Sequence, residues 1–259
     1  MENNLKMNCG VQMFTLRGMT KSESGLAEAF RFVKSAGADD VQISFFCLPP
    51  IPPARIAAIA RDTGVAVRLT HCPFDRITAD LERLIEEHRE MGCDIIGLGS
   101  MPQKAFPPKD PDAVLKFCDY LNIAATRLHE VGMRFSYHNH AFEFKKSVDG
   151  RRLFDVLIEE TVPEVSFCYD VYWSAVGKSD PFADIDRLGV RINSLHLKDL
   201  RRILGIPLMC APGKGSLDLA EAIRRADRNG VPYAFVEVDI ARDPKRAVTD
   251  GLAFFRSVR

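Results

Sequence analysis

The fold is decided by residues 37–98, GADDVQISFFCLPPIPPARIAAIARDTGVAVRLTHCPFDRITADLERLIEEHREMGCDIIGL, in which two kinds of segment alternate. Three apolar runs have the length of β-strands, and two longer segments between them carry apolar residues at helical spacing. The runs are 40–46, 65–69 and 94–98, and the helical segments are 53–63 and 79–91. Gly64 and Gly92 follow the helical segments, as expected of a residue that tolerates positive φ. This stretch therefore predicts strand, helix, strand, helix and strand in turn.

The same alternation extends to both ends of the chain. Further strands are predicted at 10–14, 134–138, 165–169, 192–197 and 233–238. Further helices are predicted at 22–35, 112–130, 152–160, 181–188, 217–229 and 244–258. Asp180-Pro181 and Asp243-Pro244 each place a capping side chain and a proline where a helix begins. The whole chain thus reads as eight strand–helix units.

Eight such units with short connections form either a closed parallel barrel or a doubly wound open sheet. The first strand is not followed by G-x-G-x-x-G, and G-x-x-x-x-G-K-[ST] occurs nowhere, which disfavours a nucleotide-binding open sheet. A length of 259 residues suits one barrel, and no linker or composition shift divides the chain. We predict a single (β/α)8 TIM barrel domain over residues 1–259.

The composition gives no electrostatic reason to expect a nucleic-acid partner, because Lys plus Arg equals Asp plus Glu at 35 each. No uncharged apolar run is long enough to span a bilayer, and residues 1–8 are too polar for a signal peptide. The seven cysteines are odd in number and include no C-x-x-C pair, which favours reduced thiols in a cytoplasmic protein. A homo-oligomer is compatible with the sequence.

Ionisable side chains gather at the carboxyl ends of the predicted strands, where (β/α)8 barrels build their active sites. The fifth to eighth strands each deliver an imidazole or a carboxylate to that rim, namely His138, Asp170, His196 and Glu237. Loop polarity or helix capping explains any one of them but not four in succession, because an apolar strand gains nothing by ending in buried charge. Neutral imidazole together with carboxylate suits Zn²⁺, Mn²⁺ or Fe²⁺, whereas an all-oxygen set would suit Mg²⁺ better.

Three other histidines have different contexts. His71 ends the third strand, where lining a pocket and a hydrogen-bonded structural role fit equally well. His88 and His129 lie within predicted helices and are expected to face solvent.

Three further side chains are candidates for substrate contact. Lys198 follows His196 by two residues and therefore lies on the same side of its strand, where it can bind a substrate oxygen or neutralise developing charge. Phe14 and Trp173 either form apolar walls for the faces of a sugar or belong to the core.

At these strand ends the sequence resembles the sugar phosphate isomerase/epimerase family, the xylose isomerase-like barrels that also include inosose dehydratase and endonuclease IV. Each similar segment is weak alone, but their order and spacing together are specific. The likeness covers nearly the whole chain, from 11–17 to Phe254-Phe255. Its most specific segments are HNHAFEF at 138–144, YDVYW at 169–173, HLKD at 196–199, GKG at 213–215 and VEVD at 236–239.

The resemblance implies a divalent metal ion, one of Mn, Zn, Mg, Co or Fe, held by Glu, Asp, His and Glu from strands five to eight. Asp170, His196 and Glu237 match the last three positions, and the first position falls on His138. Glu143, five residues later, is the other candidate for the first ligand. We favour His138 as the ligand, with Glu143 in the same pocket as an acid–base group or substrate contact.

In the epimerases of this family, two metal-bound glutamates face the two sides of the substrate carbon. A histidine in place of one of them favours a lyase, or an isomerase that uses His138, His140 or Glu143 for proton transfer. The candidate catalytic residues are therefore Glu143, Glu237, His140 and Lys198. The candidate substrate-binding residues are Phe14, His71, Trp173 and Lys198.

The predicted groups suit chemistry next to a carbonyl, because a divalent ion on a ketone and a neighbouring hydroxyl acidifies the C–H between them and stabilises the enediolate. Returning the proton gives epimerisation or aldose–ketose isomerisation, and expelling a β-substituent gives elimination. The leading hypothesis is a metal-dependent isomerase or epimerase of a small sugar, keto-sugar or sugar phosphate. The alternatives are a lyase or dehydratase of an oxidised sugar or inositol derivative, and a non-catalytic sugar-binding barrel. The neutral charge disfavours a DNA-repair enzyme like endonuclease IV.

Overall fold

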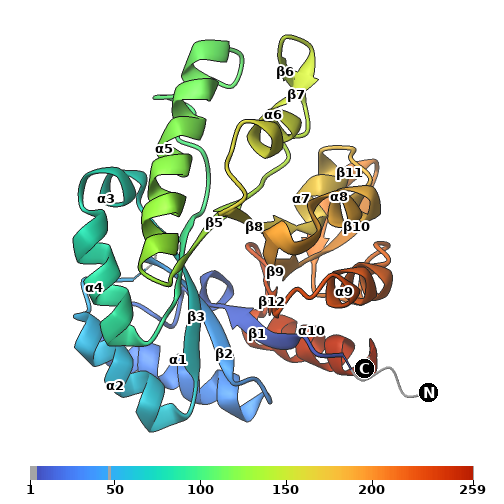
Figure 1. Ribbon diagram of the computed structural model, residues 1–259. Coiled ribbons are helices and arrows are strands. Elements are labelled where there is room, and N and C mark those ends of the chain that lie inside the picture. Colours follow the sequence, from blue (N-terminus) through green and yellow to red (C-terminus); the bar gives the residue numbers. More distant parts are fainter. Residues whose placement is uncertain (1–4, 46–47, 259) are drawn as a thin grey trace.

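The computed structural model describes residues 5–45 and 48–258, and eight of its strands close into a parallel barrel (Figure 1). This confirms the predicted fold class. In order around the barrel the strands are β1 (Asn8–Gln12), β12 (Tyr233–Val236), β9 (Ile192–Leu197), β8 (Val165–Asp170), β5 (Arg134–His138), β4 (Ile95–Leu98), β3 (Ala66–Cys72) and β2 (Asp40–Ser44). Every neighbouring pair is parallel, including β1 with β2, which closes the ring.

Helices connect the strands and cover the outside of the barrel (Figure 1). Those that lie between consecutive barrel strands, or follow the last strand, are α1 (Glu23–Ser35), α2 (Pro53–Thr63), α3 (Phe74–Ala79), α4 (Leu81–Met91), α5 (Pro111–Glu130), α6 (Leu153–Glu159), α7 (Val171–Val176), α8 (Pro181–Leu188), α9 (Leu219–Arg228) and α10 (Pro244–Val258). Two short 3₁₀ helices are η1 (Met13–Leu16) and η3 (Gly189–Arg191). Two small hairpins lie outside the barrel: β6 (Lys146–Val148) with β7 (Arg151–Arg152), and β10 (Asp199–Ile203) with β11 (Ile206–Cys210).

The helices stop where the sequence predicts. Gly64 and Gly92 adopt φ of 66° and 69° directly after α2 and α4, a left-handed conformation that costs glycine little. At the other end, the carboxylate of Asp180 accepts a hydrogen bond from the amide of Phe182 (2.9 Å) as α8 begins. Local chemistry therefore sets the lengths of the connections that bring each strand back to the ring.

Some element bounds differ from the sequence prediction. The predicted helix 79–91 is α4, which begins two residues later, at Leu81, and a short helix that was not predicted, α3, precedes it. Asp80 separates the two helices with φ −141°, and its carboxylate accepts from Arg76 Nε (3.1 Å). The first strand ends at Gln12, so Phe14 lies in η1, and the last strand ends at Val236, so Glu237 lies just beyond it. Neither α7 nor the two hairpins was predicted, because such short elements lack a recognisable period.

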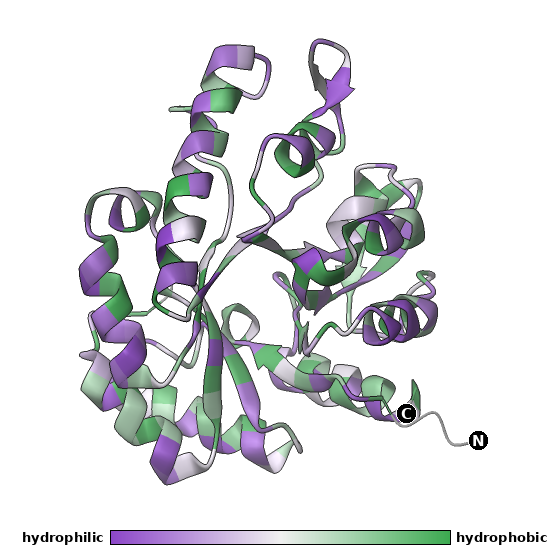
Figure 2. Ribbon diagram, in the orientation of Figure 1, coloured by the Kyte–Doolittle hydropathy of each residue, from purple (hydrophilic) through white to green (hydrophobic). Residues whose placement is uncertain are grey.

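The core has an inner and an outer layer. Inside the ring, Leu69, Ile95, Cys168 and Phe235 pack from four different strands and fill the barrel below its carboxyl rim. Larger apolar clusters lie between the strands and the surrounding helices. Figure 2 shows the helices striped in purple and green, as expected where one side of a helix packs on the barrel and the other meets water. Because this apolar layer fills the interior, a ligand that binds at the strand ends would lie above it, at the rim.

Among the described cysteines, Cys72, Cys93, Cys118, Cys168 and Cys210 are free thiols. Phe46, at the end of the predicted second strand, and Cys47 lie outside the described residues. Within residues 5–45 and 48–258, no helix has the length and apolar character needed to cross a membrane.

Candidate metal centre and cavity

Four side chains from successive strands meet at the carboxyl rim. His138 ends β5, Asp170 ends β8, His196 is the fifth residue of β9, and Glu237 follows β12. One ligand atom from each lies within 4.8 Å of the others. The side chains predicted from the sequence as metal ligands are therefore brought together by the fold.

The distances between these atoms are close to those between the ligand atoms of a tetrahedral metal site. Asp170 Oδ2 lies 3.2 Å from His138 Nε2 and 3.5 Å from His196 Nδ1. Glu237 Oε2 lies 2.8 Å from His196 Nδ1. A tetrahedral site with ligand distances of about 2.1 Å has edges of about 3.4 Å. Small side-chain movements would therefore place all four atoms around one ion.

The outer nitrogen of each imidazole is held by a hydrogen-bond acceptor. His138 Nδ1 lies 2.9 Å from the carbonyl of Gly99, and His196 Nε2 lies 2.6 Å from Oε1 of Gln42. A carbonyl accepts only, so in the neutral rings both outer nitrogens carry the proton. His138 Nε2 and His196 Nδ1 then turn lone pairs toward the carboxylates, which is the arrangement that fixes histidine ligands at metal sites.

Asp170 is held through both of its carboxylate oxygens. Oδ1 accepts from the amide of Trp173 (2.9 Å) and caps α7, which leaves Oδ2 facing the cluster. The Asn139 side chain accepts from the amide of Asp170 (2.9 Å) and donates to its carbonyl (3.2 Å). Asn139 thus fixes the end of β8 against the end of β5.

Lys198 brings a positive charge to the same place. Its Nζ lies 2.7 Å from Glu237 Oε2, 3.1 Å from Asp170 Oδ2 and 3.0 Å from Asp239 Oδ1, and its side chain is 1% exposed. Burial alone would lower the pKa of this ammonium, but the three carboxylates outweigh burial and raise it well above its usual range. Burial and the neighbouring Glu237 raise the pKa of Asp239 to about 6.

The donor set fits a divalent cation. His196 Nδ1 and Glu237 Oε2 are buried and make no hydrogen bond of ordinary geometry, although they lie 2.8 Å apart. Burial alone would lower the pKa of His196, yet Cys168 and Glu237 raise it well above its usual range. The cluster therefore attracts positive charge, and two imidazoles with two carboxylates are ligands that Zn²⁺, Mn²⁺ and Fe²⁺ accept.

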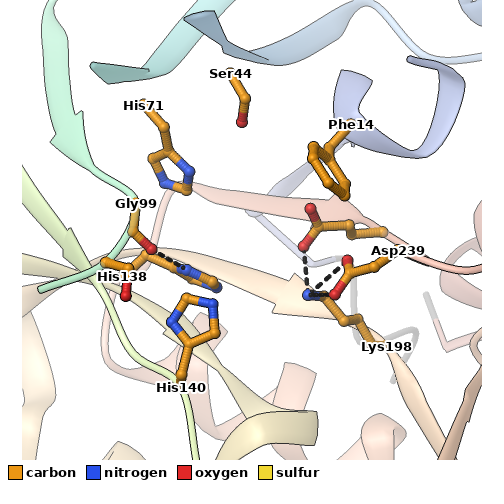
Figure 3. Close-up of a pocket in the computed structure, with 10 residues that line it drawn as sticks. Phe14, Ser44, His71, Gly99, His138, His140, Lys198 and Asp239 are labelled. Atoms are coloured by element: carbon orange, nitrogen blue, oxygen red, sulfur yellow. Dashed lines mark hydrogen bonds and ion pairs between the residues drawn. The ribbon is translucent and has the colours of Figure 1, made fainter. Parts of the chain in front are cut away.

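A cavity of about 310 Å³ opens above this cluster. Figure 3 shows the imidazoles of His71, His138 and His140 on one side and Lys198 with Asp239 on the other. Phe14, from η1, lies at the edge of the cavity. The cavity therefore has an imidazole side and a carboxylate–ammonium side.

Two of these histidines have distinct partners. His71 Nε2 lies 2.7 Å from Nε2 of Gln42, so His71 both lines the cavity and has a structural hydrogen bond, the two roles that the sequence left open. His140 Nδ1 is buried without a hydrogen-bond partner. Burial, reinforced by His138, lowers the pKa of His140 to about 3, so its ring is neutral near pH 7.

Glu143 does not reach the cavity, contrary to expectation. It is fully buried, and its oxygens accept from the Tyr137 hydroxyl (2.7 Å) and the His140 amide (2.8 Å). The turn after β5 directs Glu143 back toward the backbone, where it holds the His138–His140 segment in shape. Burial raises the pKa of Glu143 to about 8. The expected acid–base role of Glu143 is therefore not supported by its position.

Two other expectations are corrected. Trp173 is not among the side chains that line the cavity; its ring packs 5.5 Å from that of His140 and 5.6 Å from Lys198 Nζ, and so supports both from behind. His88 does not face solvent but is fully buried, with Nε2 2.7 Å from Thr70 Oγ1 and Nδ1 2.7 Å from the carbonyl of Leu84. His129 is exposed, as expected.

Sequence reasoning missed three positioning side chains: Gln42, Asn139 and Asp199. Asp199 accepts from the amides of Gly213 (3.0 Å), Gly215 (2.9 Å) and Leu217 (3.0 Å), and a Cβ on Gly215 would lie only 2.3 Å from its Oδ1. The Asp199 carboxylate therefore fixes the Gly-Lys-Gly loop, and the loop needs glycine at 215 to approach it this closely. An amide in the middle of an apolar strand was the available signal for Gln42.

The comparisons with known proteins agree with the barrel fold. Residues 30–258 match the family model described as xylose isomerase-like TIM barrel. The chain belongs to this family. Among solved structures, a sugar phosphate isomerase/epimerase from Parabacteroides distasonis is 18% identical, with a TM-score of 0.84 over 99% of this chain and 96% of that one. No curated relative matches the sequence.

Other solved structures with similar folds have named activities. An L-ribulose 3-epimerase is 15% identical, with a TM-score of 0.72 over 97% of this chain and 94% of that one. D-allulose 3-epimerase from Methylomonas sp. is 13% identical, with a TM-score of 0.73 over the full length of both chains. At these identities the likeness establishes the fold alone.

Proposed function

We propose that this protein is a metal-dependent isomerase or epimerase of a small sugar or keto-sugar, acting through an enediolate. The observation that carries this proposal is the placement of two imidazole nitrogens, His138 Nε2 and His196 Nδ1, against the carboxylates of Asp170 and Glu237 beside the cavity. Structural neighbours named as ketose epimerases support the same class. In this proposal the four side chains hold the ion.

When bound, a divalent ion would supply Lewis acidity that stabilises negative charge on the oxygens of a carbonyl substrate. The protein itself supplies the positioning. Gln42 and Gly99 orient the two histidines, and the α7 cap orients Asp170, so little reorganisation is needed during the reaction.

Proton transfer is assigned to the two opposite sides of the cavity. On one side, Glu237 lines the cavity and is the carboxylate base. On the other side, neutral His140 lines the cavity and its buried Nδ1 has no hydrogen-bond partner, so we assign this ring the proton exchange with a substrate hydroxyl or carbon. Lys198, next to Glu237, stabilises negative charge as it develops.

One observation favours elimination as a second candidate. A two-carboxylate epimerase needs a carboxylate on each face of the substrate carbon, but His138 stands at the first ligand position and Glu143 is turned away. A base on one side and an imidazole acid on the other also suit loss of water from a β-hydroxy carbonyl compound. A lyase or dehydratase of an oxidised sugar or inositol derivative is therefore the alternative.

The deciding experiment is solvent exchange. The full-length protein is loaded with Mn²⁺ or Zn²⁺ and incubated in D₂O with free ketoses, their phosphate esters and inosose, and the products are followed by NMR. Deuterium next to the carbonyl of an epimer or aldose supports the proposal, and an unsaturated or deoxy-keto product supports the lyase. Protein without bound metal and without exchange would instead indicate a binding barrel.

The proposal also includes the cellular compartment and the kind of partner. The free thiols suit a reducing compartment such as the cytoplasm, and the zero formal net charge gives no reason to expect a nucleic-acid partner. The proposed partner is a small carbohydrate. Whether two or more copies associate does not enter the proposed chemistry.

A further inference from the structure

We propose that the substrate of this site is uncharged: a free ketose, inosose or similar polyhydroxy carbonyl compound without a phosphate or carboxylate group. The inference rests on the proposed function and narrows it. It follows from the balance of charges around the cavity and from the lack of an available cation in its wall.

The charges around the cavity are already balanced once a divalent ion is in place. Three carboxylates surround this region, those of Asp170, Glu237 and Asp239, and Lys198 is the ammonium that contacts all three. One ammonium and one divalent ion together offset the three carboxylates and leave no net charge on these groups, so a neutral substrate binds without adding unpaired charge. A phosphate dianion would instead bring a surplus of negative charge into a largely buried place, which is costly unless a cation pairs with it.

Lys198 is not available as that cation. Its Nζ lies within 3.1 Å of three carboxylate oxygens, and the side chain is 1% exposed. An ammonium has three hydrogens to donate, and these three contacts account for all of them. A phosphate could reach Lys198 only by displacing one of its carboxylate partners.

The rest of the lining offers hydrogen bonds without positive charge. In the part of the chain that the structure describes, no arginine lines the cavity. Arg17 comes near the edge, but its guanidinium lies 4.3 Å from the centre of the Phe14 ring and donates to the carbonyl of Phe14 (2.9 Å). Ser44, Ser100 and His71 present neutral polar groups of the kind that pair with hydroxyls.

The size of the cavity agrees with a small neutral ligand. Its volume of about 310 Å³ lies at the lower end of the roughly 300–1,000 Å³ range of small-molecule sites. A flat apolar ring at the edge, Phe14, and neutral donors within suit a sugar, which has C–H faces and a ring of hydroxyls.

The test compares matched pairs of ligands on the full-length, Mn²⁺-loaded protein. The pairs are D-fructose with D-fructose 6-phosphate and D-xylulose with D-xylulose 5-phosphate, each measured by titration calorimetry and by D₂O exchange. At least one free sugar should bind, and its phosphate ester should bind at least tenfold more weakly. A phosphate ester that binds as tightly as its free sugar, or more tightly, would overturn the inference.

Variants test the physical cause. Asp239→Asn removes one negative charge from the cavity and should reduce the preference for the free sugar about tenfold. Asp62→Asn, which makes the same change at an exposed position on α2, should leave the preference as it is. An unchanged preference in Asp239→Asn would show that charge balance is not its cause.

Failure of the inference is distinguishable from failure of the proposed function. Tight phosphate binding that is lost in Arg17→Ala would make Arg17 a phosphate ligand and overturn the inference, while sugar chemistry stands. If neither member of any pair binds or exchanges deuterium, the proposed function falls and the substrate class falls with it.

Discussion

The Nε2 atom of His196 lies 2.6 Å from Oε1 of Gln42, whose amide nitrogen lies 2.7 Å from Nε2 of His71. One amide therefore orients two imidazoles: its oxygen accepts a hydrogen bond from Nε2 of His196, which turns Nδ1 toward the cluster, and its nitrogen donates a hydrogen bond to His71. Gln42 is buried in β2, on the opposite side of the barrel from the strands that carry the four candidate ligands.

Replacing Gln42 by leucine should weaken metal binding. The His196 proton would lose its acceptor, and the ring would lose its fixed orientation; such changes cost about 10- to 100-fold in metal affinity. Titration of Zn²⁺ against a competing chelator measures the effect. Gln103→Leu, at an exposed loop position, is the control. An affinity in Gln42→Leu equal to that of the control would mean that the amide has no part in ligand orientation.

His138 and Glu143 should differ in what their replacement does to the metal. His138→Ala removes a nitrogen 3.2 Å from Asp170 Oδ2 and should reduce bound metal strongly, whereas Glu143→Gln should retain it. Elemental analysis after dialysis against limiting metal gives the stoichiometry of each. Loss of metal from Glu143→Gln with retention in His138→Ala would reverse the assignment.

Glu237→Gln should abolish turnover and leave the fold intact. The substitution keeps the volume but removes a negative ligand and the proposed base, and loss of a general base alone costs about 10²- to 10⁴-fold in rate. Solvent exchange and circular dichroism, measured on the same preparation, report activity and fold. A variant with wild-type exchange and bound metal would place the chemistry elsewhere.

Lys198→Met should destabilise the metal-free protein more than the metal-loaded one. Without the ammonium, three carboxylates face one another in a buried place, and breaking a buried ion pair costs about 3–5 kcal/mol. A bound divalent ion restores part of the lost attraction. Thermal unfolding with EDTA and with excess Mn²⁺ measures the difference, and Lys116→Met on the exposed face of α5 is the control. Equal destabilisation in both conditions would contradict the expected coupling.

Glu143 should make stability fall with rising pH. Its folded-state pKa is raised to about 8 by burial, so the folded protein holds the proton more tightly than the unfolded chain. The stabilisation is fully present below the unfolded-state pKa near 4.5 and is lost as the pH rises through about 8. The free energy of unfolding of the wild type, minus that of Glu143→Gln, should therefore decrease by roughly a few kcal/mol between pH 4.5 and 8. Urea unfolding across this range checks the sign.

The sequence predicted the barrel and the metal cluster because both depend on periodic, local features. Strand length, helical spacing and terminal glycines define eight units, and the end of each strand marks its rim position. Side-chain direction beyond a strand was not predictable. Glu143 was placed in the cavity because it follows His138 closely, but a tight turn directs it to Tyr137 and the His140 amide instead.

Contacts between residues that are distant in sequence could not be predicted either. Gln42 contacts His196 across 154 residues, and a single buried amide in a strand has no pattern that names its partner. His88 lies on a helix with many charged neighbours and looked solvent-exposed, but its position faces Thr70 on β3.

Asp170 has two structural roles, and together they restrict which residues can replace it. Its Oδ1 accepts the hydrogen bond that caps α7, and its Oδ2 faces the other candidate ligands. Both contacts depend on the position of one short side chain. Glutamate carries the same charge on a side chain one methylene longer. In Asp170→Glu the carboxylate would therefore lose either the hydrogen bond that caps α7 or its position beside His138. A carboxylate on a stem of this one length therefore fits this position.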